Sequence, residues 1–407
     1  MDISIQRKID RMVGVPLCWV FSCLSLFSER VPEGYKPYKI LVILLSEMGS
    51  LVLARPMFDL LREKYPQARI YVLCFKRNKP FLEILDVMPS EDILTVREES
   101  LGTLIQDTIS FMWRAHRERI DTVIDCELFS RVSSIYSFLS GGKVRVGFAP
   151  YTQEGLYRGS FINRPVLYNP YHHISLQFIN LVEAIESNQV PRLKRRMEDT
   201  DFKLPKVRIE NAEKEQYARK LEADFPSLSG KSLVLLYPSG GLLPIRAWPL
   251  ENFCRISEAF LRENYAVGII GMKSDRDQAE RILRHCNSKF CVDMTGYTHS
   301  VRELVTLFHH ACLLITNDGG PGHFASITDL PCLVLFGPET PALYGPLSHK
   351  CIKLHVPLSC SPCLTAYNHR NSPCDGDNQC LKSIGPEEIL EQAHQLLAAA
   401  ERVERNL

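Results

Sequence analysis

The sequence has no marked excess of charge of either sign. Its 407 residues include 48 Lys and Arg against 47 Asp and Glu, which gives a net charge of +1. Nucleic-acid-binding proteins usually carry a strong basic excess, so this balance argues against that class of function. Low-complexity tracts and short-period repeats are also absent. With 45% hydrophobic and 23% charged residues, the composition is globular, and the length favours two domains.

A hydrophobic run long enough to span a membrane is lacking too. The apolar segment Met12–Phe27 is shorter than the roughly 20 residues that a spanning helix needs, and it contains Gly14 and Pro16. No small-residue cleavage site of a signal peptide follows it. We predict that residues 1–35 form an amphipathic, interfacial or re-entrant membrane segment, with Trp19 and the preceding basic residues near lipid headgroups. The alternative is a helix packed on the protein's own surface.

Cysteine is too sparse for a disulfide scaffold, with 14 residues spread over the whole chain. Most sit singly among apolar residues, which is typical of buried thiols in a reducing compartment. One cluster, in the loop 360–380, has the pattern Cys-x2-Cys-x10-Cys-x5-Cys, close to zinc-ribbon spacing although its last gap is longer. We predict a structural zinc there and leave free thiols and disulfides as alternatives. The proposed ligands are Cys360, Cys363, Cys374 and Cys380.

Two halves of the chain repeat one pattern of apolar strands alternating with amphipathic helices. The first half opens with the continuous apolar strand Tyr38–Leu45, and the pattern restarts at Ser232–Tyr237 after the polar stretch Pro191–Arg208. Continuous apolar strands separated by helices indicate parallel sheets covered on both faces. We therefore predict two doubly wound, Rossmann-like α/β domains that face each other across a cleft, over residues 36–205 and 206–407. The last helix, from Pro386, closes the chain.

Three turns after strands carry the candidate ligand-binding residues, because ligands of such sheets bind beyond the carboxyl ends of the strands. In the turn after Leu313–Thr316, Asp318 is followed by Gly319 and Gly320, and His323 stands one turn into the next helix. Exposed N–H groups at a helix start and close backbone approach at glycine suit a phosphate or diphosphate. The aspartate would cap the helix or accept from a sugar hydroxyl. The alternative is a capped helix without a ligand.

In the turn after Ser232–Tyr237, Ser239 and Gly240 offer hydroxyl and backbone donors. Arg246 follows in a loop before Trp248, where an arginine could clamp a diphosphate. The alternative is a surface arginine stacked on that tryptophan.

The turn after the first strand lacks the three glycines of a dinucleotide fingerprint, which argues against a nicotinamide enzyme. It contains Glu47, a carboxylate predicted to lie at the floor of the cleft, followed by Gly49 and Ser50. The alternative for Glu47 is a helix-capping or solvated residue.

The order of these turns and their motifs resembles glycosyltransferase family 9, the heptosyltransferases. The resemblance covers about residues 38 to 400 and is most specific in three motifs, Asn317–His323, Phe336–Pro341 and the Arg-x-Trp-Pro of Arg246–Pro249. It implies the GT-B architecture, with the donor bound mainly by the C-terminal domain and the acceptor by the N-terminal one. It also implies inverting transfer from a nucleotide-activated sugar without a catalytic metal.

The resemblance also assigns roles to individual residues. After the first strand the family commonly has Gly-Asp, whose aspartate is the proposed base, whereas this sequence has Gly49-Ser50. Serine cannot act as that base at neutral pH, so we propose Glu47 as its substitute. Glu127 and Arg131 are expected on the acceptor side. The residues expected on the donor side are Gly49, Ser50, Ser239, Gly240, Arg246, Asp318, Gly319, Gly320 and His323.

Together these features predict an inverting glycosyltransferase of lipopolysaccharide or O-antigen type. It would move a heptose or similar sugar from a nucleoside-diphosphate sugar to a lipid-linked or surface-polysaccharide acceptor. Its expected place is the cytoplasmic face of a bacterial inner membrane, as a peripheral or monotopic protein, with no catalytic cofactor and no nucleic-acid partner. The alternatives are an inactive membrane scaffold that kept the fold and a nucleotide-sugar epimerase of the same fold.

Overall fold

The structure is a computed structural model that describes residues 3–27, 31–45, 48–128, 130–149, 157–187, 189, 202, 204–365 and 371–405. The chain divides into two compact units, which we call unit 1 (Met1–Asp201) and unit 2 (Phe202–Thr365 and Asn371–Leu407). The division falls inside the predicted linker Pro191–Arg208, most of which lies outside the described residues.

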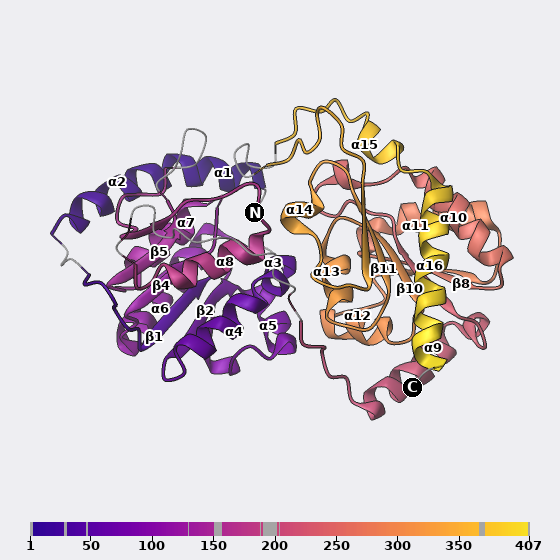
Figure 1. Cartoon of the computed structure of the whole chain (residues 1–407), viewed down its shortest axis with the longest axis horizontal. Coiled ribbons are helices and arrows are strands. Elements are labelled where there is room, and N and C mark those ends of the chain that lie inside the picture. The colour runs from indigo at the N-terminus through magenta and orange to yellow at the C-terminus, as the bar shows by residue number, and fades with distance from the viewer. Residues whose placement is uncertain are drawn as a thin grey trace. The chain divides into compact units, whose positions relative to one another are not determined.

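Unit 1 is built on a six-stranded parallel sheet in the order β3-β2-β1-β4-β5-β6 (Figure 1). Its strands are β1 (Lys39–Ile43), β2 (Arg69–Phe75), β3 (Ile93–Val96), β4 (Thr122–Asp125), β5 (Val144–Phe148) and β6 (Arg164–Val166). Its helices are α1 (Ile3–Met12), α2 (Gly14–Ser25), α3 (Met48–Leu53), α4 (Arg55–Lys64), α5 (Lys79–Leu85), α6 (Leu101–Glu118), α7 (Arg131–Leu139) and α8 (Ile174–Glu183). Strand order reverses between β1 and β4, which is the switch point where ligands of such sheets bind.

Unit 2 repeats the architecture, with the strand order β12-β11-β10-β7-β8-β9, again all parallel (Figure 1). Its strands are β7 (Leu233–Tyr237), β8 (Ala266–Gly271), β9 (Cys291–Thr295), β10 (Leu313–Asn317), β11 (Cys332–Phe336) and β12 (Cys351–His355). Its helices are α9 (Asn211–Asp224), α10 (Leu250–Arg262), α11 (Arg276–Cys286), α12 (Val301–Phe308), α13 (Gly320–Ser326), α14 (Pro341–Tyr344), α15 (Gln379–Lys382) and α16 (Pro386–Arg405).

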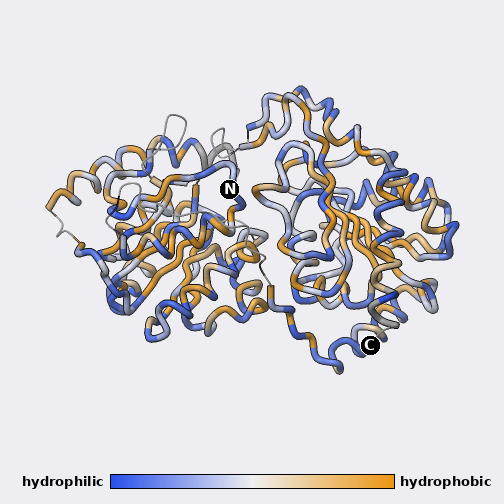
Figure 2. Tube along the Cα trace, in the orientation of Figure 1, coloured by the Kyte–Doolittle hydropathy of each residue, from blue (hydrophilic) through white to orange (hydrophobic). Residues whose placement is uncertain are grey.

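The central strands of both sheets are mostly apolar, with polar residues such as Asp125 and Asn317 at their carboxyl ends, and Figure 2 shows them as hydrophobic segments inside each unit. β10 and β11 are buried at every position, as expected for strands covered by helices on both faces. The two predicted doubly wound domains are therefore confirmed as two parallel six-stranded α/β units. α3 and α4 are separated at Ala54, the N-cap of α4, and Pro56 is the second residue of α4, where its missing N–H costs no helical hydrogen bond.

The N-terminal segment forms the two short helices α1 and α2. No helix in the described part of the chain is both long and apolar enough to cross a bilayer. One face of α2 packs on α7 through Gly14, Cys18 and Ser22, and the Phe21 ring stacks on Phe138 at a centroid distance of 4.6 Å. The segment is thus packed on the protein's own surface along this face, which was the alternative to a membrane segment.

Candidate functional site

In unit 2, the turns after β7 and β10 are joined by the side chain of Asn317, the last residue of β10. Its Nδ2 donates to the carbonyls of Pro238 at 2.9 Å and Ser239 at 3.2 Å, and its Oδ1 accepts from Trp248 N at 3.0 Å. Because β7 and β10 are neighbours in the sheet, this one amide fixes the Ser239 turn and the loop that carries Arg246. The predicted donor-side turns therefore meet at the carboxyl ends of adjacent strands.

Arg246 lies between two buried carboxyl groups. Its Nη2 donates to Glu339 Oε2 at 2.6 Å, and its Nε lies 3.3 Å from Asp318 Oδ2 as an ion pair without hydrogen-bond alignment. Asp318 follows β10 and Glu339 follows β11, so the two acids also come from neighbouring strand ends. We call these three residues the Arg246 cluster, and their contacts differ from the alternative of a surface arginine stacked on Trp248.

Burial and mutual charge interactions shift the pKa values of the three side chains in the Arg246 cluster. Burial raises the pKa of Glu339 to about 8, although the positive charge of Arg246 acts against this shift. The pKa of Asp318 is raised as well, again by burial and against the effect of Arg246. Burial disfavours the charge on Arg246, but Asp318 and Glu339 outweigh it and raise its pKa. Two carboxyl groups that interact this closely titrate as a pair, and burial shifts this pair toward its protonated forms.

Ser239 takes part in a second contact between strand ends. Its hydroxyl donates to Asp275 Oδ1 at 2.9 Å and accepts from Gly241 N at 3.1 Å. The other Asp275 oxygen accepts from Met272 N at 2.7 Å, so this carboxylate fixes the turn after β8 against the turn after β7. Gly240 allows the tight loop, since a Cβ there would lie 2.6 Å from Leu243 O.

The glycines of the turn after β10 have different structural roles. Gly319 is the N-cap of α13, and Gly320 is its first residue. Gly322 lets α13 approach β11, because a Cβ there would lie 2.9 Å from Val334 Cγ2. His323, the other predicted residue of this turn, is buried in α13. At least one glycine of this motif thus serves packing of helix on sheet rather than access for a ligand.

An open hollow of about 320 Å³ lies at the carboxyl ends of β8 and β9. Thr295 and Gly296 end β9 at this hollow, and Lys273 follows β8. Its other lining residues are Lys220, Asp224, Arg276, Asp293, Tyr297 and His299. Basic and acidic side chains both line this hollow, so it can hydrogen-bond a polar ligand.

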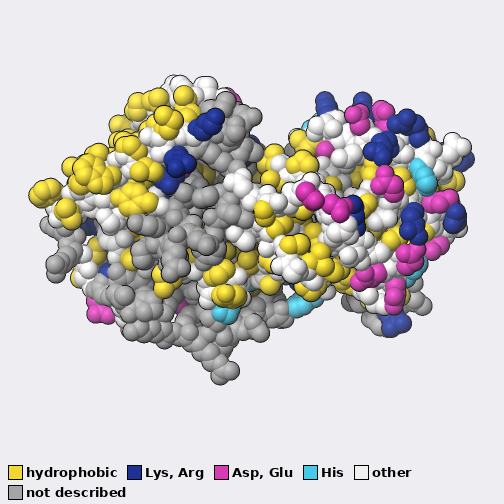
Figure 3. Space-filling view, turned by 90° about the horizontal axis from the view of Figure 1, so that it is seen from above, with side chains coloured by type: hydrophobic (Ala, Val, Ile, Leu, Met, Phe, Trp, Pro, Cys, Tyr) yellow, Lys and Arg dark blue, Asp and Glu magenta, His cyan; other side chains and the backbone are white. Residues whose placement is uncertain are grey.

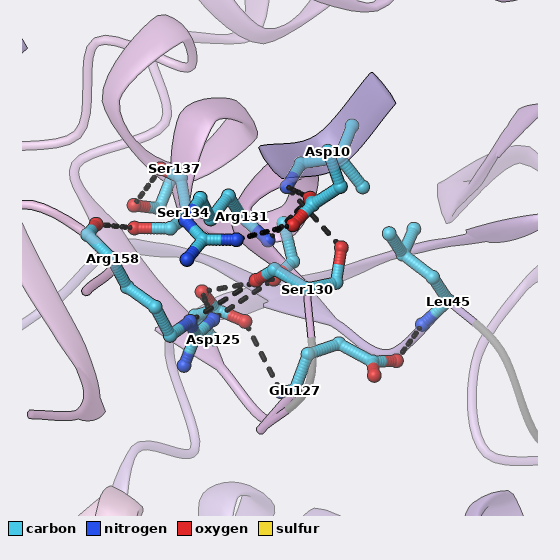
Figure 4. A network of polar contacts seen from close by, with 11 residues as sticks. Asp10, Leu45, Asp125, Glu127, Ser130, Arg131, Ser134, Ser137 and Arg158 are labelled. Carbon is cyan, nitrogen blue, oxygen red and sulfur yellow. Dashed lines mark hydrogen bonds and ion pairs between the residues drawn. The ribbon is translucent and has the colours of Figure 1, made fainter. Parts of the chain in front are cut away.

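Unit 1 has a buried polar network at the carboxyl ends of β1 and β4 (Figure 4). Asp125, the last residue of β4, is fully buried and ion-pairs with the buried Arg158. The Ser133 hydroxyl donates to Asp125 Oδ2 at 3.2 Å, and Glu127 N donates to Asp125 Oδ1 at 3.1 Å. Burial raises the pKa of Asp125 to about 6, while the charge of Arg158 acts to lower it.

The two predicted acceptor-side residues belong to this network. Glu127 Oε1 accepts from Leu45 N at 2.7 Å, directly after β1. Arg131 donates through Nη1 to Asp10 of α1 at 2.8 Å and through Nε to the Tyr157 carbonyl at 2.8 Å. Asp10 also accepts from Arg131 N at 2.8 Å, which caps the start of α7. The Arg131 guanidinium therefore holds α1 in place in this structure.

The predicted base, Glu47, lies outside the described residues, as does Ser46. Gly49 and Ser50 follow in α3, whose first residue is Met48, and the Ser50 carbonyl accepts from Ala54 N at 2.8 Å. The predicted turn after β1 thus leads into a helix that begins beside the Leu45–Glu127 contact.

The four clustered cysteines do not form a metal centre in this structure. Cys363 Sγ lies 3.1 Å from Ser372 Oγ, and Cys374 Sγ lies 3.8 Å from both Asp375 Oδ1 and Asn378 Oδ1. Among the described residues, which include all four thiols, no group of three or more His, Cys, Asp or Glu side chains could hold a metal ion. The structural zinc therefore stays a prediction.

Several residues of the two sites were not predicted as functional. Asn317 and Glu339 stand in motifs that carry the family resemblance. These two residues and Asp275 all lie at or shortly after a strand end, and that position was the available signal. Asp125 could have been found by the same signal, because it is the last residue of a buried strand. Asp10 had no such signal, because it stands on a helix far from any strand end in the sequence.

Two doubly wound parallel sheets, each with buried ionisable side chains at the carboxyl ends of its strands, define a two-domain α/β enzyme of the GT-B kind. The sequence model of glycosyltransferase family 9 (heptosyltransferase) matches residues 111–372, and the chain belongs to this family of glycosyltransferases. The predicted membership of glycosyltransferase family 9 is therefore confirmed, and a glycosyltransferase is favoured over an epimerase.

Individual relatives support the assignment over most of the chain. Lipopolysaccharide heptosyltransferase 2 of Salmonella typhimurium is 24% identical over 370 residues, which cover 88% of this chain and 99% of the relative. The solved ADP-heptose lipopolysaccharide heptosyltransferase II of Escherichia coli has a TM-score of 0.68 at 21% identity and covers 89% of this chain and 99% of its own. An E. coli heptosyltransferase solved with ADP has a TM-score of 0.57 at 14% identity, covering 87% and 99%.

Proposed function

We propose that this protein transfers a heptose from ADP-heptose to a lipid-linked acceptor in lipopolysaccharide core synthesis, with inversion at the anomeric carbon. The names of its relatives support the sugar, the nucleotide and the acceptor class. The observation that carries the proposal is the Arg246 cluster at the carboxyl ends of β10 and β11, beside the Ser239–Asp275 contact.

In this proposal unit 2 binds the donor. Arg246 meets the diphosphate, and Ser239, Gly240 and the backbone of Gly319 and Gly320 surround it. We propose that Asp318 and Glu339 share one proton, which leaves the Arg246 cluster without net charge, whereas two ionised acids would make it negative. A neutral cluster does not repel the donor, and Arg246 can exchange a carboxylate partner for a phosphate oxygen. The hollow at β8 and β9 is the proposed place for the nucleoside.

The transfer step needs a base but no metal. A carboxylate, which we propose is Glu47, takes the proton of the acceptor hydroxyl as that oxygen attacks the anomeric carbon. The bond from that carbon to the ADP oxygen breaks, and ADP leaves with the bonding electron pair. Arg246 stabilises the charge that develops on the leaving phosphate. His323 is one turn into α13 and is the second proposed donor toward this phosphate.

Unit 1 takes the acceptor in this proposal. Glu127 lies at the carboxyl ends of β1 and β4, at the switch point of the sheet. Arg131 supports this place through its contact with Asp10. Because the acceptor is lipid-linked, the proposed place of action is the cytoplasmic face of the bacterial inner membrane.

The experiment that tests the function combines a binding panel with donor turnover. Calorimetric titration with ADP, UDP and GDP should show tightest binding of ADP. ADP-heptose should release ADP in a manner that depends on added lipopolysaccharide acceptor. Ser239→Ala removes the hydroxyl next to the proposed diphosphate and should weaken ADP binding, whereas Ser229→Ala, at an exposed site in unit 2, should not. Binding of ADP without any acceptor-dependent turnover would instead support the inactive scaffold.

A further inference from the structure

The outward face of α2 is an apolar surface with no partner among the described residues of unit 1. Trp19 is 63% exposed and Leu24 52%, and Phe27, just past the helix end, is 90% exposed. The opposite face is anchored on α7, where a Cβ on Gly14 would lie 3.0 Å from Arg131 Cβ. Figure 3 shows hydrophobic side chains crowded over the part of unit 1 that carries α1 and α2, with basic side chains beside them. The helix is held firmly, so the exposure of its outer face is not a consequence of loose packing.

A second exposed apolar stripe runs along α6. Its members recur every four residues, which places them on one side of the helix. They are Leu101, Ile105, Ile109 and Trp113. The other side of α6 is buried, and Phe111 packs edge-on against Tyr136 of α7 at a centroid distance of 5.3 Å. α2 and α6 both contact α7, so the helices that carry the two stripes pack against the same neighbour.

The exposed charged side chains of α1, α2 and α6 are basic, whereas Glu99, two residues before Leu101, is an exposed acid. Lys8 and Arg11 of α1 are exposed, and the Arg117 guanidinium of α6 lies 5.2 Å from the centre of the Trp113 ring. No Asp or Glu is exposed among the described side chains of α1, α2 and α6. Apolar stripes with tryptophan and flanking basic residues are the chemistry of helices that lie in the plane of an anionic lipid surface.

We propose that α2 and α6 together dock unit 1 on an anionic lipid bilayer, lying in its interface without crossing it. This docking proposal rests on the proposed function only for the choice of lipid as partner. The docking proposal goes beyond the proposed function because α6, which carries half of the surface, has no part in donor or acceptor binding.

The docking surface is connected to the acceptor side by continuous polar contacts. Ser22 of α2 accepts from Ser160 N at 2.8 Å and lies 3.1 Å from the Tyr157 hydroxyl. Tyr157 O accepts from Arg131, which also holds Asp10 of α1. These contacts hold the α1–α2 pair in a fixed position relative to Arg131, which starts α7 at the acceptor side.

The test is co-sedimentation of the full-length protein with vesicles, without donor or acceptor. Vesicles of phosphatidylcholine alone are compared with vesicles that also contain phosphatidylglycerol. Three double variants are compared: Trp19→Ser with Leu24→Ser on α2, Ile109→Ser with Trp113→Ser on α6, and the control Leu167→Ser with Tyr171→Ser. The control removes exposed apolar side chains of unit 1 that lie outside both stripes. Thermal unfolding checks that each variant is folded.

Wild type and control should bind the anionic vesicles, and each stripe variant should lose at least about tenfold in partitioning, since two buried apolar side chains are removed from the lipid. Equal binding of the α6 variant and wild type would overturn the role of α6. Failure of wild type to bind, or a wild-type dimer that only the stripe variants dissociate, would overturn lipid docking altogether. The stripe variants should still transfer heptose to a water-soluble acceptor fragment. If wild type and stripe variants both fail to transfer heptose to this fragment, the result contradicts the proposed function and not the docking.

Discussion

Replacing Arg246 by alanine should destabilise unit 2 much more than the loss of an ordinary ion pair. The side chain is almost entirely buried between Asp318 and Glu339, at 3.3 Å and 2.6 Å. Its removal leaves two buried carboxyl groups without their positive partner. Breaking a buried pair in this way typically costs about 3–5 kcal/mol of unfolding free energy. Arg302→Ala is the matched control, because Arg302 pairs with Glu213 at 2.6 Å at the surface of the same unit, where about 1 kcal/mol or less is expected.

The loss of unfolding free energy caused by Arg246→Ala should increase as the pH rises. Burial raises the pKa of Glu339 to about 8 in the wild type, and Arg246 acts to lower it. Without Arg246 the folded variant binds its protons more tightly than the folded wild type. The variant is therefore least stable, relative to wild type, at pH above about 8, and the difference shrinks as the pH falls toward 6.

Tryptophan fluorescence during urea unfolding measures this stability. The chain has three tryptophans, of which Trp19 and Trp113 are exposed and Trp248 is buried beside Arg246. The change of emission on unfolding thus reports mainly on unit 2. If Arg246→Ala costs no more than Arg302→Ala from pH 6 to pH 9, the account of the Arg246 cluster is wrong.

Three further changes test other parts of the structure. Glu47→Gln should lower single-turnover transfer by about 10²- to 10⁴-fold at unchanged ADP affinity, and transfer within about threefold of wild type would exclude Glu47 as the base. Asp125→Asn leaves Arg158 buried without its partner and should cost about 3–5 kcal/mol. Because the pKa of Asp125 is raised to about 6, the advantage of wild type over this variant should fall from about pH 4 to pH 6 and then level off, as urea unfolding across that range would show. Elemental analysis of freshly purified reduced protein tests the zinc prediction, and Cys360→Ser with Cys363→Ser should leave the metal content and stability unchanged if the thiols are free.

Buried central strands could be predicted closely from the sequence because both of their faces are covered. The predicted strands Tyr38–Leu45 and Ser232–Tyr237 contain the observed strands β1 (Lys39–Ile43) and β7 (Leu233–Tyr237). The edge strands of unit 2, β9 and β12, were not predicted. An edge strand is partly solvated, and the sequence Cys351–His355 accordingly has polar residues among its apolar ones, without the continuous run that marks a buried strand.

The turns that contain the proposed donor-binding residues could be predicted to lie close together, since parallel strands end at one edge of the sheet. The sequence could not predict which side chains pair there. Arg246 and Glu339 are far apart in the sequence, and they meet only because β10 and β11 lie side by side next to β7. The contact of Asp10 with Arg131 likewise depends on where α1 packs, which no local pattern determines.

The most direct test of the central claim is a single-turnover reaction of the full-length protein with ADP-heptose and a lipopolysaccharide acceptor. The anomeric configuration of the product is read by nuclear magnetic resonance. The account predicts one heptose transferred per ADP released, with the anomeric configuration opposite to that of the donor. A product with retained configuration would contradict the inverting mechanism, and no transfer by a protein that binds ADP would contradict the proposed activity.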